Sequence, residues 1–107
     1  MTVALPLLAV SALPDRERVR VVAAGEVDLF TVDLLRAQFE ELFAVGWRDV
    51  TADLREVRFM DTSGVHALLS ADQQARERGA RLTLIVGPGP VSRLLELTGT
   101  DRVLALA

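Results

Sequence analysis

The sequence predicts an α/β domain in which helices pack on a mixed β-sheet, with the element order ββαβαβαβ. Short β-prone runs bounded by turn residues alternate with segments whose apolar residues recur at helical spacing. Two of these runs come first with no helix between them, which predicts a leading antiparallel hairpin. The chain has 107 residues, of which half are hydrophobic and a quarter charged. This is enough for one hydrophobic core, so we expect a single domain over residues 1–107.

The predicted hairpin has strands at residues 7–13 and 18–24, joined by a turn at residues 14–17. In the second run Val19, Val21 and Ala23 alternate with arginines, which is the period of a strand with one buried face.

The apolar start of the chain also resembles a secretory signal, with a cleavage-like sequence at Val10-Ser11-Ala12. Such a signal normally begins with a positive charge, and the first one here is Arg16, beyond the apolar stretch. The stretch is also too short to span a bilayer. We therefore expect a buried strand there, no membrane association and a cytoplasmic protein.

A first helix is predicted over residues 32–45, with Thr31 as its N-cap and Gly46 as its stop. Apolar residues recur through it at helical spacing. Trp47 directly follows the stop, and we expect its ring to cover one end of the core rather than to stack on a ligand.

The remaining elements follow in alternation. A third strand is predicted at residues 49–54, continuing in extended form over 57–60, and a second helix at 65–78. The mostly apolar run 81–86 predicts a fourth, central strand. The last elements are a third helix from Val91 to Thr98 and a final strand at 102–106.

Composition excludes several classes of chemistry. The chain has no cysteine and one histidine, so disulfides, a thiolate nucleophile and a cysteine- or histidine-rich metal site are excluded. All 12 basic residues are arginine, which removes Schiff-base chemistry and the lysine of a phosphate-binding loop. A net charge of -3 argues against nucleic acid as a partner. We expect a binding or switching module with no cofactor and no metal.

One junction combines several features of a modification site. Asp61-Thr62-Ser63-Gly64 lies between a predicted strand and a predicted helix. Asp61 or Thr62 can cap that helix, and Gly64 removes side-chain bulk beside Ser63. A phosphate on this serine would face the positive end of the helix dipole. From the tetrapeptide alone, a simple capped turn is the more common explanation.

The sequence as a whole resembles the STAS domain family, the anti-sigma-factor antagonists. Three segments carry the resemblance, in this order: Gly25-Glu26-Val27-Asp28, residues 53–64 ending in Asp61-Thr62-Ser63-Gly64, and residues 91–99. The middle motif is specific, whereas the flanking ones are weak alone. Thr62 stands where the family more often has serine, and Thr100 where it often has leucine.

The resemblance implies a partner-switching protein of bacterial gene regulation. In that family the unphosphorylated form binds an anti-sigma factor, which is commonly a serine kinase, and so releases a sigma factor. It implies Ser63 as the phosphorylated residue, with Thr62 as a second candidate, and a serine phosphatase that reverses the modification. The residues expected at the partner surface are Glu26, Asp28, Thr31, Asp61, Thr62, Gly64 and His66. A phosphate adds about -1.5 to -2 charges, which would repel an acidic partner surface while leaving the fold intact.

Three alternatives remain. A Ser63–His66 pair could act as a nucleophile and base, but no third group orients the imidazole. The loop Gly87-Pro88-Gly89-Pro90 could bind a small anion or nucleotide, but its prolines lack N–H donors. The chain could instead be a subunit or sensor in a larger signalling assembly. We expect a monomer or weak dimer without enzymatic activity.

Overall fold

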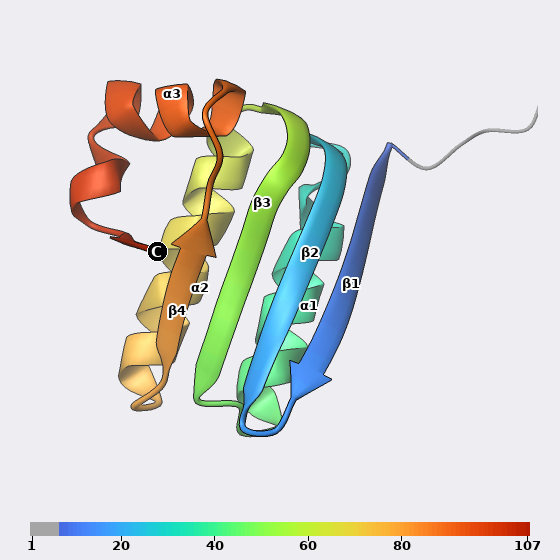
Figure 1. Cartoon of the computed structure of the whole chain (residues 1–107), viewed down its shortest axis with the longest axis vertical. Helices are drawn as coiled ribbons and strands as arrows, with labels where there is room; N and C mark the ends of the chain where they lie inside the picture. Colours follow the sequence, from blue (N-terminus) through green and yellow to red (C-terminus); the bar gives the residue numbers. More distant parts are fainter. Residues whose placement is uncertain (1–6) are drawn as a thin grey trace, which may run out of the picture.

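The structure is a computed structural model that describes residues 7–107, and its five strands form one mixed sheet in the order β1-β2-β3-β4-β5 (Figure 1). The hairpin strands β1 and β2 are antiparallel, while β2, β3, β4 and β5 run parallel to one another. This confirms the predicted α/β fold with a mixed sheet. In chain order the elements are β1 (Leu8–Asp15), β2 (Arg18–Val27), α1 (Val32–Ala44), β3 (Asp49–Met60), α2 (Thr62–Glu77), β4 (Arg81–Ile85), α3 (Pro90–Thr98), a 3-10 helix (Thr100–Arg102) and β5 (Ala105–Leu106).

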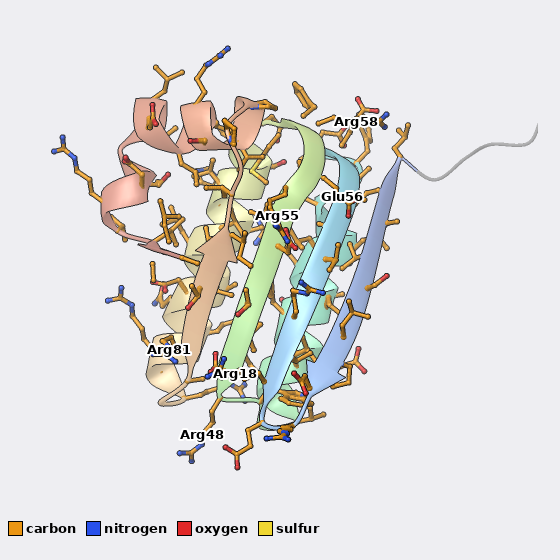
Figure 2. All side chains as sticks on the ribbon, viewed as in Figure 1. Arg18, Arg48, Arg55, Glu56, Arg58 and Arg81 are labelled. Carbon is orange, nitrogen blue, oxygen red and sulfur yellow. The ribbon has the colours of Figure 1, made fainter. Side chains whose placement is uncertain are left out.

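The sheet has one apolar face and one polar face. Helices α1 and α2 lie side by side behind the sheet in Figure 1. Along β2, the buried Val19, Val21 and Ala23 alternate with exposed Arg18 and Arg20, as their spacing predicted. The polar side chains of the strands lie on the face away from these two helices (Figure 2). Burial of the apolar face against α1 and α2 is the main driving force for this fold.

The hairpin is longer than predicted. Strand β1 continues to Asp15, so the turn contains only Arg16 and Glu17, and Arg16 adopts a positive φ of 59°. Pro14 is tolerated within β1 because this is an edge strand, where one side of the backbone needs no partner. Residues 1–6, the first part of the segment considered as a secretory signal, lie outside the described part. The rest of that segment forms β1, which is mostly exposed and not the buried strand that we expected.

Strand β2 also runs past its predicted end, because Gly25 permits a bulge. Its φ is 119°, and a Cβ atom there would lie 2.1 Å from the Leu7 carbonyl oxygen. The pairing of β2 with β3 shifts register on either side of this glycine. The Glu26 N–H donates to the same Leu7 oxygen at 2.8 Å. Gly25 therefore holds the start of β1 against the end of β2, where the following loop begins.

Two predictions at the carboxyl-terminal half are confirmed only in part. Strand β4 lies between β3 and β5, but β5 has only two residues, and the burial of β4 alternates as in a strand with one covered face. The final strand was expected over residues 102–106 but contains only Ala105 and Leu106, because Thr100–Arg102 form a 3-10 helix. The Thr100 carbonyl accepts from the N–H groups of Val103 and Leu104, which closes a turn where the strand was predicted.

The predicted loop–helix junctions are mostly confirmed. Helix α1 begins at Val32 as expected, and Trp47 is partly buried against the core just after that helix. Helix α3 begins at Pro90, which suits a first helical position. None of the helices within residues 7–107 is long and apolar enough to cross a membrane.

Candidate functional site

Two loops meet where the parallel strands β2 and β3 end. One is the β2–α1 loop, residues 28–31, and the other is the junction between β3 and α2. The Asp61 N–H donates to the Val27 carbonyl at 3.1 Å, which joins the two loops directly. Because both helices start here, the positive ends of the α1 and α2 dipoles lie at this end of the sheet (Figure 1). In an open α/β sheet, this is the edge where ligands and partners approach.

Helix α2 begins at Thr62, three residues before the predicted start at Val65. Asp61 is the N-cap, and its Oδ1 accepts from the Ser63 N–H at 2.9 Å. The same oxygen also accepts from the Ser63 hydroxyl. Of the two capping residues considered, Asp61 therefore takes the role, and Thr62 and Ser63 lie in the first turn of the helix.

These donors hold the pKa of the Asp61 carboxyl below its ordinary value of 3.8. The Ser63 hydroxyl is the main cause, burial acts in the opposite direction, and backbone N–H groups of Ser63, Gly64 and Leu29 add to the lowering. Asp61 is therefore an anion at neutral pH. Its charge lies directly beside the Ser63 oxygen.

Ser63 and Thr62 differ in their surroundings. The Thr62 side chain is exposed and makes no side-chain hydrogen bond among those of residues 7–107. Ser63 is half-buried, and its hydroxyl is oriented by Asp61. Both residues lie in the first turn of α2, at the positive end of the helix dipole, which favours an added anion.

Gly64 allows the first turn of α2 to lie directly on the sheet. It is buried, and a Cβ atom at this position would lie 2.5 Å from Met60 Cγ and 3.0 Å from Val27 Cγ1. These distances are shorter than normal carbon–carbon contacts. Gly64 thus sets the position of Ser63 through backbone packing and offers no side chain to a partner.

The β2–α1 loop is held by its own polar side chains. Asp28 Oδ1 accepts from the N–H groups of Phe30, at 2.9 Å, and Thr31, at 3.1 Å. The Thr31 hydroxyl accepts from the Asp28 N–H at 3.0 Å and donates to the Glu26 carbonyl at 2.8 Å. Such reciprocal bonds are typical of a tight Asx-type turn.

Thr31 precedes α1 as predicted, but its side chain does not cap the helix. The hydroxyl is used inside the loop, and the residue is only 9% exposed. We predicted Thr31 as a partner-contact residue; its position instead fits a role in shaping the loop. Glu26 and Asp28 are half-buried at the same end of the sheet as Ser63.

His66 lies exposed on the first turns of α2. The proton of the Ser63 hydroxyl is directed to Asp61, so the histidine does not serve as its hydrogen-bond acceptor. The geometry thus gives no support to a serine–histidine nucleophile. Within residues 7–107, no group of three or more histidine and carboxylate side chains is arranged to hold a metal ion.

The structure also reveals apolar residues at this end that the sequence analysis did not single out. Phe30 is 91% exposed and Leu29 is 73% exposed, both in the β2–α1 loop. The sequence signal was a pair of large apolar residues directly after the Gly-Glu-x-Asp segment, in a position predicted to be a loop. A loop that connects a strand to a helix would ordinarily be polar at such positions.

Charged side chains cover part of the polar sheet face (Figure 2). Asp53 of β3 is only 5% exposed and accepts from Arg55 through both oxygens, at 2.9 and 2.7 Å. Arg20 approaches the same carboxylate at 3.9 Å. The Arg55 hydrogen bonds hold the pKa of Asp53 below its ordinary value, against the effect of burial. Asp53 is therefore a nearly buried negative charge that is stabilised by cationic partners on the polar face of the sheet.

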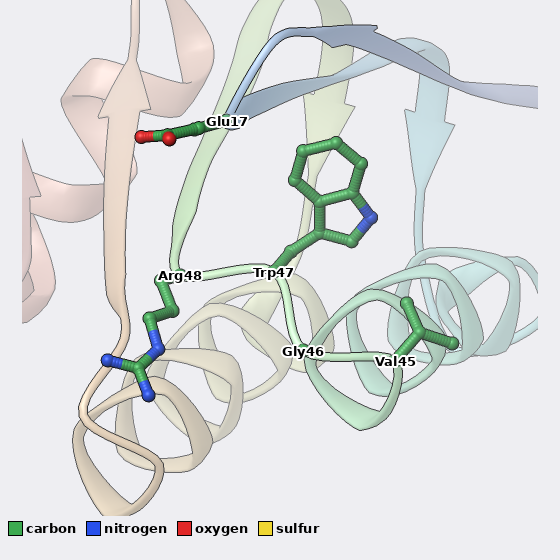
Figure 3. A pocket seen from close by; sticks show the side chains of 5 residues that line it. All are labelled: Glu17, Val45, Gly46, Trp47 and Arg48. Carbon is green, nitrogen blue, oxygen red and sulfur yellow. The ribbon is translucent and has the colours of Figure 1, made fainter.

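A shallow pocket lies at the opposite end of the sheet from Ser63, where α1 ends and β3 begins. Figure 3 shows its lining residues, which come from the hairpin turn and from the loop after α1: Glu17, Val45, Gly46, Trp47 and Arg48. The Trp47 ring extends from this loop toward the hairpin. This arrangement agrees with the predicted role of Trp47 as a cover for one end of the core.

Comparison with known proteins gives consistent results for sequence and fold. A family model described as "Mlab, STAS domain" matches residues 12–106. An anti-sigma F factor antagonist of Paenibacillus polymyxa is 28% identical over 86 residues, covering 78% of this chain and 72% of the relative. An anti-sigma-B factor antagonist of Listeria monocytogenes is 26% identical over 92 residues, covering 86% of this chain and 81% of the relative.

Solved structures share the fold at lower identity. The crystal structure of an anti-sigma factor antagonist from Mycobacterium paratuberculosis has a TM-score of 0.83 at 21% identity, covering 92% of this chain and 84% of that one. The anti-sigma factor antagonist SpoIIAA in its unphosphorylated form has a TM-score of 0.77 at 23% identity, with coverages of 92% and 88%. The Bacillus SpoIIAA in its phosphorylated form has a TM-score of 0.70 at 24% identity, with coverages of 92% and 91%.

Proposed function

Because the chain belongs to the STAS domain family, we propose that it is an anti-sigma factor antagonist switched by phosphorylation of Ser63. In this proposal the unphosphorylated protein binds an anti-sigma factor with serine kinase activity and releases the sigma factor that this partner holds. The names of the relatives in Paenibacillus and Listeria support the first part of the proposal. A serine phosphatase would restore the binding form.

The observation that carries the proposal is the geometry of the Ser63 hydroxyl. It lies in the first turn of α2, half-buried and held by the Asp61 carboxylate. A kinase that docks on this end of the sheet would meet the serine in one fixed orientation, which favours transfer of a phosphoryl group. Thr62 is the second candidate acceptor, and it is the less suitable one because no neighbouring side chain within residues 7–107 orients its hydroxyl.

Local charge explains how phosphorylation would act on binding. The added charge of about -1.5 to -2 would lie beside the Asp61 carboxylate, at the end of the sheet that also carries Asp28. The helix dipole of α2 partly compensates the phosphate within the domain, so the fold should persist. The cost falls on the complex, because a partner surface that accommodates a neutral hydroxyl would then face a bulky dianion. A loss of a few kcal/mol lowers affinity by two or more decades.

Ser63→Ala and Ser63→Asp test the switch. We expect Ser63→Ala to bind the kinase-type anti-sigma factor like the unphosphorylated wild type and to resist release by ATP. We expect Ser63→Asp to bind at least tenfold more weakly. Binding is measured by calorimetry with purified kinase-type anti-sigma factors of the same organism, and phosphorylation by intact mass and peptide mapping.

Thr62→Val is the matched control for acceptor identity. Its phosphorylation should equal that of the wild type, whereas Ser63→Ala should take up no phosphate. Phosphate found on Thr62 in the wild type would move the assignment by one residue. Equal binding by all three variants, before and after incubation with ATP, would contradict the switch. Sedimentation of the chain as a large homo-assembly would favour a subunit of a larger signalling complex instead.

A further inference from the structure

We propose that Phe30, together with Leu29, is the apolar anchor of the docking surface and enters an apolar pocket of the partner that is rimmed by cationic groups. This inference rests on the proposed function, since the partner is the kinase-type anti-sigma factor. It goes further by naming the side chains that contribute most of the binding free energy. These differ from the side chains that make binding depend on phosphorylation.

Exposure is the first argument. Phe30 and Leu29 present two large apolar side chains to solvent in adjacent positions. Leu34 at the start of α1 and Phe59 near the end of β3 are exposed at the same end of the sheet. Single exposed apolar residues are common on protein surfaces, but a group of them beside a proposed modification site is typical of an interface. Aromatic residues are enriched at the energetic centres of such interfaces.

Rigidity of the loop is the second argument. The Phe30 N–H donates to Asp28 Oδ1, and the following Thr31 is buried and bonded within the loop. The Val32 N–H donates to the Asp28 carbonyl at 2.9 Å, which connects the loop to the first turn of α1. Phe30 is thus held out from a backbone that is already fixed. Less conformational entropy is lost on binding when the contacting segment is ordered beforehand.

Charge defines the chemistry of the pocket that would receive this anchor. Three carboxylates lie in or beside this loop: Asp28 in the loop itself, Asp61 at the adjoining start of α2, and Asp33 in the first turn of α1, while the cationic Arg58 lies at the same end of the sheet (Figure 2). A complementary partner offers an apolar cavity for the ring, with arginine or lysine groups around it. The apolar contact made by Phe30 does not depend on whether Ser63 is phosphorylated. The contacts made by the surrounding carboxylates do depend on it, because a phosphate would add negative charge beside them.

The anchor and the switch should therefore be separable by mutation. Phe30→Ala should weaken binding to the kinase-type anti-sigma factor by about 30-fold or more, as expected for removal of a buried aromatic anchor. Ser63→Asp should weaken binding by a similar factor in the wild type and in the Phe30→Ala background. Val45→Ala is the matched control, because Val45 is 70% exposed at the opposite end of the molecule. It should bind like the wild type.

The affinities are measured by calorimetry with the same purified partners, and the melting temperature of each variant is measured alone. Because Phe30 is almost fully exposed, Phe30→Ala should melt at the wild-type temperature. Suppose that the wild type binds the partner and Ser63→Asp binds it weakly, but the affinity of Phe30→Ala is within threefold of the wild-type affinity. The proposal that Phe30 is the anchor is then wrong, and the proposed function stands. If the wild type binds none of the kinase-type anti-sigma factors, the proposed function fails, and the anchor with it.

Discussion

Asp61 and Ser63 are joined by two hydrogen bonds that end on the same carboxylate oxygen of Asp61. Asp61 Oδ1 accepts from both the backbone N–H and the hydroxyl of Ser63, so the residue that begins helix α2 also orients the proposed acceptor. A single carboxylate thus has both a structural role and the regulatory role that we propose. This coupling gives several measurable consequences.

Replacement of the cap should destabilise the domain. Asp61→Ala removes the acceptor for the Ser63 N–H, and loss of such an N-cap costs about 1 kcal/mol. We expect a melting temperature lower by roughly 4–8 °C, since this is a small domain. Asp61→Asn is the control, because asparagine caps helices about as well as aspartate. An unchanged melting temperature in Asp61→Ala would show that the cap contributes nothing.

The Ser63 hydroxyl should control the ionisation of its neighbour. Ser63→Ala removes the main group that lowers the pKa of Asp61, so that pKa should rise toward 3.8. Phosphorylation should raise it as well, because the donor is lost and a dianion is added. Carbon-detected NMR titration of the Asp61 carboxyl measures both effects. Thr62→Val, which leaves the hydroxyl of Ser63 in place, should leave the titration unchanged.

Acid should weaken the domain through two carboxylates. The pKa values of Asp53 and Asp61 are both lower in the folded chain than their ordinary 3.8. The unfolded chain therefore binds protons first, and the stability that these groups contribute is complete above pH 3.8 and lost as the pH falls further through the folded values. Urea unfolding between pH 7 and pH 2.5 measures this loss. The double variant Asp53→Asn with Asp61→Asn should lose less stability between pH 4 and pH 2.5 than the wild type. If its free energy of unfolding falls as steeply as that of the wild type, other groups cause the acid sensitivity.

The close contact at the start of α2 should not tolerate a side chain. Gly64→Ala places a Cβ atom against Met60 and Val27, and overpacking of this kind costs about 1–3 kcal/mol. This exceeds the gain of up to about 1 kcal/mol that alanine has over glycine in a helix. Denaturant unfolding measures the difference. Gly87→Ala is the control, since the nearest atom to its Cβ is 3.7 Å away in Arg55, and it should be near neutral.

The polar sheet face should depend on one ion pair more than on the others. Arg55→Ala removes both guanidinium hydrogen bonds and leaves the buried Asp53 carboxylate with the backbone N–H of residue 55, at 3.2 Å, and with Arg20, at 3.9 Å; it should lower the melting temperature by about 5 °C. Arg18→Ala removes a pairing to Asp49 in which the arginine side chain is 78% exposed, and should change little. Equal effects of the two substitutions would mean that the burial of Asp53 carries no special cost.

The sequence alone determined the order of the elements and the position of the proposed acceptor. Alternation along β2 and helical spacing in α1 are local periodicities, so they are readable before any tertiary contact is known. The junction at residues 61–64 was readable for the same reason. Strand, capping residues and helix follow one another directly in the chain.

The tertiary structure determined those features of the fold and the site that local sequence patterns do not specify. The short length of β5 follows from its limited pairing with β4, and the exposure of Phe30 depends on how Asp28 and Thr31 bond within their loop. Asp61 rather than Thr62 caps α2 because its oxygen reaches the Ser63 N–H while its backbone is joined to Val27 of a neighbouring strand. These outcomes depend on contacts between segments that are distant in the chain or on competition among neighbouring donors, and neither is encoded in residue spacing.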